Sequence, residues 1–292
     1  MSTVIIINPI SGGASARVAR ARVQLARAVV GRDVAPAEVF LTEGVGHARE
    51  LTIAALARGA RLVFAWGGDG TINEIASVLA FGVVPLGIIR AGSGNGFARE
   101  LGVSARPTTA IADALHAVPR PIDVGEIDGR LFVNMAGIGF DAHVAHGFAT
   151  ATRRGFIGYA AIAARALTSY VPQRYRVTIG GVETAHRAIV VTIANSAQFG
   201  NNARIAPGAL LDDGELDLVV VEERSRIATL AQLPRLFNGG VARVPGCTIR
   251  RITEVTIECD TPMAYHVDGE PVSSGTRLRA RIHPGALRVA VR

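Results

Sequence analysis

Short apolar runs alternate with helix-like patterns through the first hundred residues. The runs cover residues 4–7, 39–41, 62–66 and 83–89, and each ends in a turn of polar or glycine residues. Uninterrupted runs of this kind are typical of strands that are buried on both faces. Helices are expected between them, for example over residues 15–29, and Ile72, Ile75 and Leu79 recur at helical spacing after the third run. These four strand–helix steps predict a parallel sheet with helices on both faces.

The pattern changes after residues 119–121, which read Pro-Arg-Pro. Short runs, several of them alternating apolar and polar residues, now predict an antiparallel, β-rich region. They cover residues 131–133, 176–179, 188–193, 215–221, 254–258 and 276–282, with helical insertions expected at 156–167 and 227–237. We therefore predict an α/β domain over residues 1–121 and a β-rich domain over residues 122–285. A last strand at residues 286–292 can return to the first domain.

The turns after the strands carry the candidate chemistry, because parallel strands end at one edge of the sheet and ligands bind there. Gly67, Gly68 and Gly70 allow positive φ angles and let a ligand approach the backbone. The helix that follows offers free N–H groups to an anion. Asp69 is the exception, since a carboxylate repels phosphate unless it holds Mg²⁺ or takes a proton. The alternative is an ordinary turn with Asp69 as the helix N-cap.

Composition narrows the chemistry further. The chain has 292 residues, a net charge of +7 and 31 basic residues, every one of them arginine. The absence of lysine excludes a Walker A loop and Schiff-base catalysis. Any phosphate must therefore be held by backbone N–H groups, arginine or metal. Aromatic residues make up 5% and do not interleave with arginine, so no platform for nucleic acid is expected.

Three features favour a reduced, cytoplasmic setting. Cys247 and Cys259 lack the spacing of a metal site or a disulfide framework. The N-terminus lacks the pattern of a signal peptide. No apolar run reaches the roughly 18 residues of a transmembrane helix. A lipid substrate would have to be met peripherally, at the membrane surface.

Two acidic turns mark the β-rich region. Residues 210–217 read Leu-Leu-Asp-Asp-Gly-Glu-Leu-Asp, and carboxylates with backbone carbonyls in such a turn suit Mg²⁺ or Ca²⁺. A solvated acidic turn is the alternative. Asp268 and Glu270 flank Gly269 in a hairpin-like turn that could direct both carboxylates to one side. Paired carboxylates serve as metal ligand and general base in phosphoryl transfer, although Asp-Gly is also a common hairpin turn.

Together these pieces are specific. Residues 8–13, 67–74, 92–98, 122–125, 132–141 and 268–270 read NPISGG, GGDGTINE, GSGNGFA, IDVG, FVNMAGIGFD and DGE. In this order and spacing the sequence resembles the diacylglycerol kinase catalytic-domain family, which includes soluble bacterial lipid kinases and the sphingosine and ceramide kinases. The resemblance covers about residues 4–291. The GGDGT segment alone is shared with NAD kinases and related to the phosphofructokinase motif, and the other segments narrow the family to lipid kinases.

The resemblance implies an N-terminal α/β nucleotide domain of the NAD-kinase and phosphofructokinase type, a β-rich C-terminal lipid domain, and ATP with Mg²⁺ in the cleft. Glu270 matches the usual proton acceptor, with Asp268 beside it. Asp69 matches a residue tied to Mg²⁺ or to substrate deprotonation. A structural Mg²⁺ site is matched by Leu210, Asp213 and Glu215, with carbonyls at the first and third positions. The positions that match nucleotide contacts are Asn8, Pro9, Ser11, Gly12, Gly13, Thr42, Gly67, Gly68, Asp69, Gly70, Thr71, Asn73 and Ser93.

Departures from the family pattern bear on the substrate. Gly96 stands where the common bacterial form has an acid, and the preceding Gly-Ser-Gly-Asn is closer to the sphingosine and ceramide kinases. Glu215 replaces a residue that is usually apolar in the family.

The implied activity is transfer of the γ-phosphoryl group of ATP to a lipid hydroxyl, with diacylglycerol as the first candidate and a sphingoid base or phosphatidylglycerol as alternatives. An NAD kinase and a non-catalytic nucleotide- or lipid-binding regulator are further alternatives, and a homodimer stays open.

Overall fold

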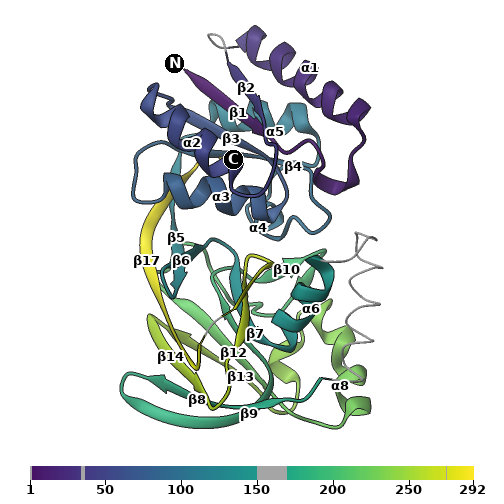
Figure 1. Cartoon of the computed structure of the whole chain (residues 1–292), viewed down its shortest axis with the longest axis vertical. Helices are drawn as coiled ribbons and strands as arrows, with labels where there is room; N and C mark the ends of the chain where they lie inside the picture. Colours follow the sequence, from purple (N-terminus) through teal and green to yellow (C-terminus); the bar gives the residue numbers. More distant parts are fainter. Residues whose placement is uncertain (1, 34–36, 150–169, 274) are drawn as a thin grey trace. The chain divides into compact units, whose positions relative to one another are not determined.

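The structure is a computed structural model that describes residues 2–33, 37–149, 170–273 and 275–292 (Figure 1). The chain folds into two compact units. Unit 1 comprises Met1–Ile122 and Gly285–Arg292, and unit 2 comprises Asp123–Pro284. The predicted helical insertion at residues 156–167 lies outside the described residues.

Unit 1 is built on a parallel sheet with the strand order β4-β3-β1-β2. The strands are β1 (Thr3–Ile7), β2 (Glu38–Leu41), β3 (Leu62–Gly67) and β4 (Leu86–Arg90). Ile7 pairs with Leu41 on one side and with Trp66 on the other, so the carboxyl ends of these three strands are in register. The helices are α1 (Ala16–Asp33), α2 (His47–Ala57), α3 (Asp69–Leu79), α4 (Gly96–Glu100) and α5 (Pro107–His116). The predicted α/β class with a parallel sheet is confirmed.

The central strands form because their apolar side chains have core on both sides. All five residues of β1 are buried, and one core cluster gathers Ile5, Ile7, Phe64, Trp66 and Ile89. The predicted strand at residues 83–89 starts later than expected, at Leu86, and Val83 is 79% exposed. Pro85 has no N–H to donate to a ladder, although its carbonyl accepts from Val63 N.

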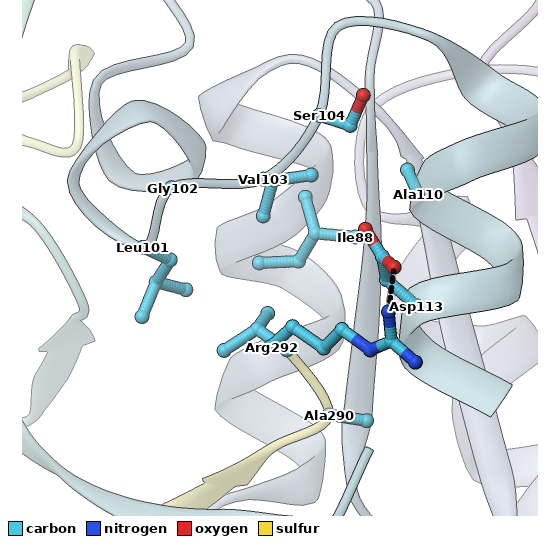
Figure 2. Close-up of a pocket in the computed structure, with 10 residues that line it drawn as sticks. Ile88, Leu101, Gly102, Val103, Ser104, Ala110, Asp113, Ala290 and Arg292 are labelled. Carbon is cyan, nitrogen blue, oxygen red and sulfur yellow. Dashed lines mark ion pairs between the residues drawn. The ribbon is translucent and has the colours of Figure 1, made fainter. Parts of the chain in front are cut away.

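The chain end belongs to unit 1. Strand β17 (Arg277–Val289) brings Val289 beside Leu86 in parallel pairing, and Ala290 N donates to Leu86 O at 2.9 Å. Figure 2 shows Ala290 and Arg292 beside Ile88 of β4 and Asp113 of α5. These residues help to line a pocket of about 40 Å³, in which Arg292 Nη1 lies 3.6 Å from Asp113 Oδ1. The C-terminal segment thus covers the flank of the sheet beside β4.

Unit 2 is a β-rich body with the strand order β16-β15-β7-β9-β8-β14-β17, in which β12 joins β9, β13 joins β12, and β5 joins β17 and β6. The ladders that join β7–β9 and β12–β16 are antiparallel, as expected for the second region. Two cores lie on opposite faces, because Leu218 and Val220 enter one cluster while Val219 enters the other. The strands are β5 (Arg120–Ile127), β6 (Arg130–Phe132), β7 (Met135–Gly139), β8 (Gln173–Ile179), β9 (Val182–Ala194), β12 (Leu216–Glu222), β13 (Cys247–Ile252), β14 (Glu254–Cys259), β15 (Ala264–Val267) and β16 (Glu270–Ser273), with β10 (Gln198–Gly200) and β11 (Ala203–Arg204) as a separate pair.

Unit 2 also contains helices. The predicted insertion at residues 227–237 is largely α8 (Arg226–Gln232) followed by a 3₁₀ turn at Leu233–Leu236. Helix α6 (Phe140–Ala149) directly follows β7 and was not predicted, nor was β7 itself, whose Gly137 and Gly139 interrupt the apolar pattern. None of the helices in the described part of the chain is long and apolar enough to span a bilayer.

Candidate active site

The predicted nucleotide-binding turns lie together at the carboxyl edge of the unit 1 sheet. Asn8 N donates to Trp66 O at 2.9 Å, Thr42 N donates to Ile7 O at 2.9 Å, and Ala91 N donates to Gly67 O at 2.9 Å. Strand β1 has β2 on one side and β3 on the other, so successive strands are added to opposite sides of β1 and the strand order reverses there. This is the switch point at which open α/β sheets bind ligands.

Glycine is required where three of these turns touch. A Cβ on Gly92 would stand 2.6 Å from Gly68 Cα, and a Cβ on Gly12 would overlap Ala91 O. Gly12 also has a φ of 71°, in the left-handed region that favours glycine. A Cβ on Gly68 would face Ser11 Oγ at 3.5 Å. The turns after β1, β3 and β4 therefore form one continuous backbone surface, which a phosphate could approach.

Two asparagines fix the shape of this surface. Asn8 Nδ2 donates to Thr71 Oγ1 at 3.1 Å, and Asn8 Oδ1 accepts from Ile10 N at 3.1 Å. Asn95 adopts a φ of 52°, accepts from Gly92 N at 2.8 Å and donates back to Gly92 O at 2.6 Å. Asn95 lies in the sequence motif at residues 92–98, where it had no assigned role. In the structure its side chain closes the turn by bonding to Gly92.

Arg22 is a residue that the sequence pattern missed. Its guanidinium reaches back from α1 to the turn after β1, where Nη1 donates to Asn8 O and Nη2 donates to Ser11 O, both at 3.2 Å. Partial burial lowers the pKa of Arg22 from its ordinary value. Arg17, Arg20 and Arg27 on the same helix are exposed, so nothing in the sequence distinguishes Arg22 from a solvated arginine. Its two bonds hold the turn that carries Ser11 and Gly12.

Asp69 is the first residue of α3 and lies beside the turn after β4. A Cβ on Gly94 would stand 3.3 Å from Asp69 Oδ2. Arg90 ends β4 close to this turn, and burial together with the positive charge of Arg99 lowers its pKa. The sequence signal for Arg90 was its position as the last residue of a strand that ends at the ligand edge. This edge therefore brings one carboxylate and a partly desolvated cation to the same group of turns.

The remaining predicted residues of unit 1 differ in exposure. Thr42 and Thr71 are buried, Asn73 is half-buried, and Ser93 is exposed in its turn. Glu74 has a structural role, because its carboxylate accepts from Gly46 N at 2.8 Å and from Ala48 N at 3.0 Å at the start of α2. An acidic group is favourable at a helix N-terminus. Glu74 therefore ties α3 to α2 behind the glycine turns.

The predicted Asp-Gly-Glu hairpin is present in unit 2. Val267 of β15 pairs with Glu270 of β16, which leaves Asp268 and Gly269 as a two-residue loop. Their φ angles are 48° and 87°, and a loop with two positive φ angles is a type I′ turn. Asparagine or aspartate followed by glycine is the preferred sequence for that turn. Glu270 is exposed at the start of β16.

Asp268 and Glu270 have different surroundings. Asp268 is 6% exposed, and its Oδ2 accepts from Val133 N while its Oδ1 accepts from Asn134 N and Met135 N, all at 2.9 Å. Its own N–H donates to Met135 O. Asp268 therefore ties the hairpin to the start of β7, whereas the Glu270 carboxylate is accessible to a substrate. The sequence could not reveal this, since the bonds join residues more than 130 positions apart.

The acidic turn at residues 210–215 is closed by a buried carboxylate. Asp123, 3% exposed, accepts from Gly214 N at 2.7 Å. Asp213 Oδ1 accepts from Glu215 N at 3.1 Å, and Arg251 Nη1 lies 3.2 Å from Glu215 Oε2 and 3.7 Å from Asp213 Oδ2. In the described part of the chain no three His, Cys, Asp or Glu side chains form a metal cluster. Carboxylate oxygen is a donor of the kind that Mg²⁺ takes. Both carboxylates are paired with Arg251, which offsets part of their charge.

Comparison with known proteins decides the family. The profile of the diacylglycerol kinase catalytic domain matches residues 2–127. The profile of the YegS C-terminal NAD kinase beta sandwich-like domain matches residues 134–291, more than half of the chain. The chain belongs to the YegS and diacylglycerol kinase family of lipid kinases. The family resemblance drawn from the sequence motifs is thereby confirmed.

Relatives in this family cover most of the chain. A probable lipid kinase YegS-like of Pseudomonas aeruginosa is 34% identical over 266 residues, which are 89% of this chain and 85% of that protein. A protein of the same description from Chromohalobacter salexigens is 32% identical over 254 residues, 85% of this chain and 80% of its own. A crystal structure described as that of a putative diacylglycerol kinase from Bacillus anthracis str. Sterne has a TM-score of 0.81 at 23% identity, and the match covers 100% of this chain and 97% of that one. At that identity the likeness shows the fold alone.

Proposed function

We propose that this protein is an ATP-dependent lipid kinase whose acceptor is a lipid hydroxyl, with diacylglycerol as the first candidate. The observation that carries the proposal is the meeting of the turns after β1, β3 and β4 at the switch point of the unit 1 sheet. That surface is made of backbone, and the chain has no lysine with which to grip a phosphate. The family to which the chain belongs supplies the reaction class.

In this proposal the unit 1 turns bind ATP. The turns at residues 11–13 and 67–71 line the place of the phosphates, and the free N–H groups at the start of α3 favour the anion there. Asn8 and Arg22 preserve the shape of the first turn, and Asn95 preserves that of the third. Thr42, Asn73 and Ser93 are proposed nucleotide contacts at the rim. Positioning of the γ-phosphoryl group supplies most of the rate in phosphoryl transfer.

The proton acceptor in the proposal is Glu270. The lipid hydroxyl oxygen forms a bond to the γ-phosphorus, the bond from that phosphorus to the β–γ bridging oxygen breaks, and ADP leaves. The hydroxyl proton passes to the Glu270 carboxylate, whose exposure permits the contact. Asp268 serves by holding the turn, because its oxygens accept three backbone N–H groups. Asp69 is the second candidate for the base.

Magnesium enters the proposal through two sets of residues. Asp69 would hold Mg²⁺ at the phosphate turns, where the ion offsets the negative charge of ATP. Leu210 and Glu215, through their carbonyls, and Asp213, through its carboxylate, would hold a second, structural ion.

Chelation of Mg²⁺ is expected to abolish transfer. In the absence of ATP, Asp213→Asn is expected to remove any thermal stabilisation that Mg²⁺ gives the wild type.

The test is an acceptor panel in vesicles. Wild-type protein with ATP and Mg²⁺ is offered diacylglycerol, monoacylglycerol, sphingosine, phosphatidylglycerol and, separately, NAD. A phosphorylated diacylglycerol supports the proposal as stated, and a product from another lipid changes only the substrate. Phosphorylated NAD alone would make the protein an NAD kinase. ATP binding with no phosphorylated product would favour a non-catalytic regulator. Vesicle sedimentation tests the proposed peripheral membrane contact. Light scattering of the protein without vesicles measures its mass and so tests for a homodimer.

A further inference from the structure

Beneath the Glu270 hairpin lies a buried pair of side chains to which the proposed chemistry gives no role. Asp141, in the first turn of α6, is 6% exposed, and His266 of β15 is 3% exposed. His266 Nε2 lies 2.9 Å from Asp141 Oδ2. The pair packs directly on Gly137 of β7, where a Cβ would overlap both side chains. Gly137 pairs with His266 in the ladder between β7 and β15, so the glycine provides the space for the ring and the carboxylate.

The other ring nitrogen of His266 faces the hairpin. Gly269 N donates to His266 Nδ1 at 3.2 Å. An imidazole nitrogen can accept only when it carries no proton, so the ring proton belongs on Nε2, on the side of Asp141. Burial alone would lower the pKa of His266, and the carboxylates of Asp141 and Asp268 outweigh it and raise the pKa. The Gly269 N–H disfavours a proton at Nδ1. Asp141 therefore selects the tautomer that lets His266 accept from the turn.

We infer that Asp141 and His266 are positioning residues that fix the backbone of the Asp268–Gly269 turn and thereby the direction of Glu270. The turn has two anchors, since Asp268 bonds to the start of β7 and Gly269 bonds to His266. Glu270 follows Gly269 directly, so a loose Gly269 displaces its carboxylate. The consequence for turnover rests on the proposed function of Glu270. The tautomer of His266 and its hydrogen bond with Gly269 are independent of that function.

The two amide substitutions of His266 separate its two contacts. The Oδ1 of asparagine comes close to the place of Nδ1, so His266→Asn keeps an acceptor for Gly269 and loses the contact with Asp141. The Nε2 of glutamine comes close to the place of the histidine Nε2, so His266→Gln keeps a donor for Asp141 and loses the acceptor. Each variant leaves a buried amide with one partner, so the two carry similar costs to the fold.

The expected result is an asymmetry between the variants. His266→Gln should lower kcat about tenfold, the equivalent of one hydrogen bond, with the KM values for ATP and lipid within about twofold of wild type. His266→Asn should stay within about threefold of wild type in kcat. By NMR, the exchange rate of the Gly269 amide should rise about tenfold in His266→Gln and change little in His266→Asn. Equal kcat losses in two folded variants, or equal protection of Gly269 in both, would overturn the inference.

A measurement on the wild type covers the case in which a variant does not fold. At a pH above the pKa of the His266 ring, its ¹⁵N chemical shifts should show a protonated Nε2 and an unprotonated Nδ1. A neutral ring with its proton on Nδ1 would overturn the inference. This readout and the amide exchange require no catalysis. A wild type that phosphorylates no acceptor therefore counts against the proposed function alone, while the tautomer and the exchange rates still decide the role of the pair.

Discussion

Gly92 lies so close to Gly68 that a methyl group on Gly92 would stand 2.6 Å from Gly68 Cα. The contact joins the turn after β4 to the turn after β3, although the two residues are 24 positions apart in the sequence. Neither turn can move without the other, because the approach is backbone to backbone and has no flexible side chain to give way. The contact leaves no room for a side chain between the two turns.

Gly92→Ala should therefore weaken nucleotide binding. The backbone must shift to admit the methyl group, at a cost of about 1–3 kcal/mol, so the Kd for ATP is expected to rise about five- to 150-fold. Gly208→Ala is the matched control, since a Cβ there meets no atom within 4 Å and its φ is not in the left-handed region. Calorimetric titration with ATP measures the effect. Equal Kd values in Gly92→Ala and the control would show that the contact is irrelevant to the nucleotide.

Arg22→Met should act on the neighbouring turn. The substitution keeps much of the aliphatic stem and removes the two donors to Asn8 O and Ser11 O. With a charged donor lost, the turn is expected to loosen by about 1–2 kcal/mol and the KM for ATP to rise about five- to thirtyfold. Arg20→Met on the exposed face of α1 should change the KM less than twofold, because Arg20 is solvated and substitutions of solvated side chains usually have small effects. A larger effect at Arg20 than at Arg22 would refute the assignment.

The sequence was a good guide where local pattern and structure coincide. The apolar runs at residues 4–7 and 62–66 form most of strands β1 and β3 and are almost entirely buried, and glycine turns follow both strands. The pattern could not distinguish Arg22 from the solvated arginines beside it, because the difference lies in its position relative to two carbonyls. It also could not show that Asp268 is enclosed by the N–H groups of residues 133–135 while Glu270 stays exposed. Contacts across 130 residues follow from the tertiary fold. Strand β7, whose first residue makes one of these contacts, was not predicted because its glycines interrupt the apolar pattern.

Glu126 should make stability fall in acid. Partial burial would raise the pKa of Glu126, but hydrogen bonds from His283 and Arg281 lower it below its ordinary value. A carboxyl group whose pKa is lowered by folding stabilises the protein above its unfolded-state pKa of about 4.3, and this contribution is lost as the pH falls through the folded-state value. Wild type should therefore exceed Glu126→Gln in free energy of unfolding at pH 7, and the difference should shrink below about pH 4.

Urea unfolding from pH 3 to pH 7 measures this difference. Glu183→Gln, which changes an exposed strand glutamate, is the control and should show a smaller difference from wild type at pH 7. A gap between wild type and Glu126→Gln that stays constant down to pH 3 would contradict the role given to the ion pairs of Glu126.

Glu270→Gln tests the base. The side chain is exposed at the start of β16, so the exchange of one oxygen for an amide should leave the melting temperature within about 1 °C of wild type. An amide cannot take the hydroxyl proton, and the loss of a general base lowers kcat by about 100- to 10,000-fold. Near-wild-type turnover would move the base to Asp69, and Asp69→Asn is the variant that would then be expected to lose activity.

The central claim is that the γ-phosphoryl group of ATP ends on a lipid hydroxyl, and the most direct measurement follows that group. Wild type and Glu270→Gln are incubated side by side with γ-labelled ATP, Mg²⁺ and diacylglycerol vesicles, and the label is counted in the extracted lipid. We expect labelled phosphatidic acid with wild type and almost none with Glu270→Gln. Lipid that stays unlabelled with wild type, for diacylglycerol and for every other lipid of the panel, would contradict it.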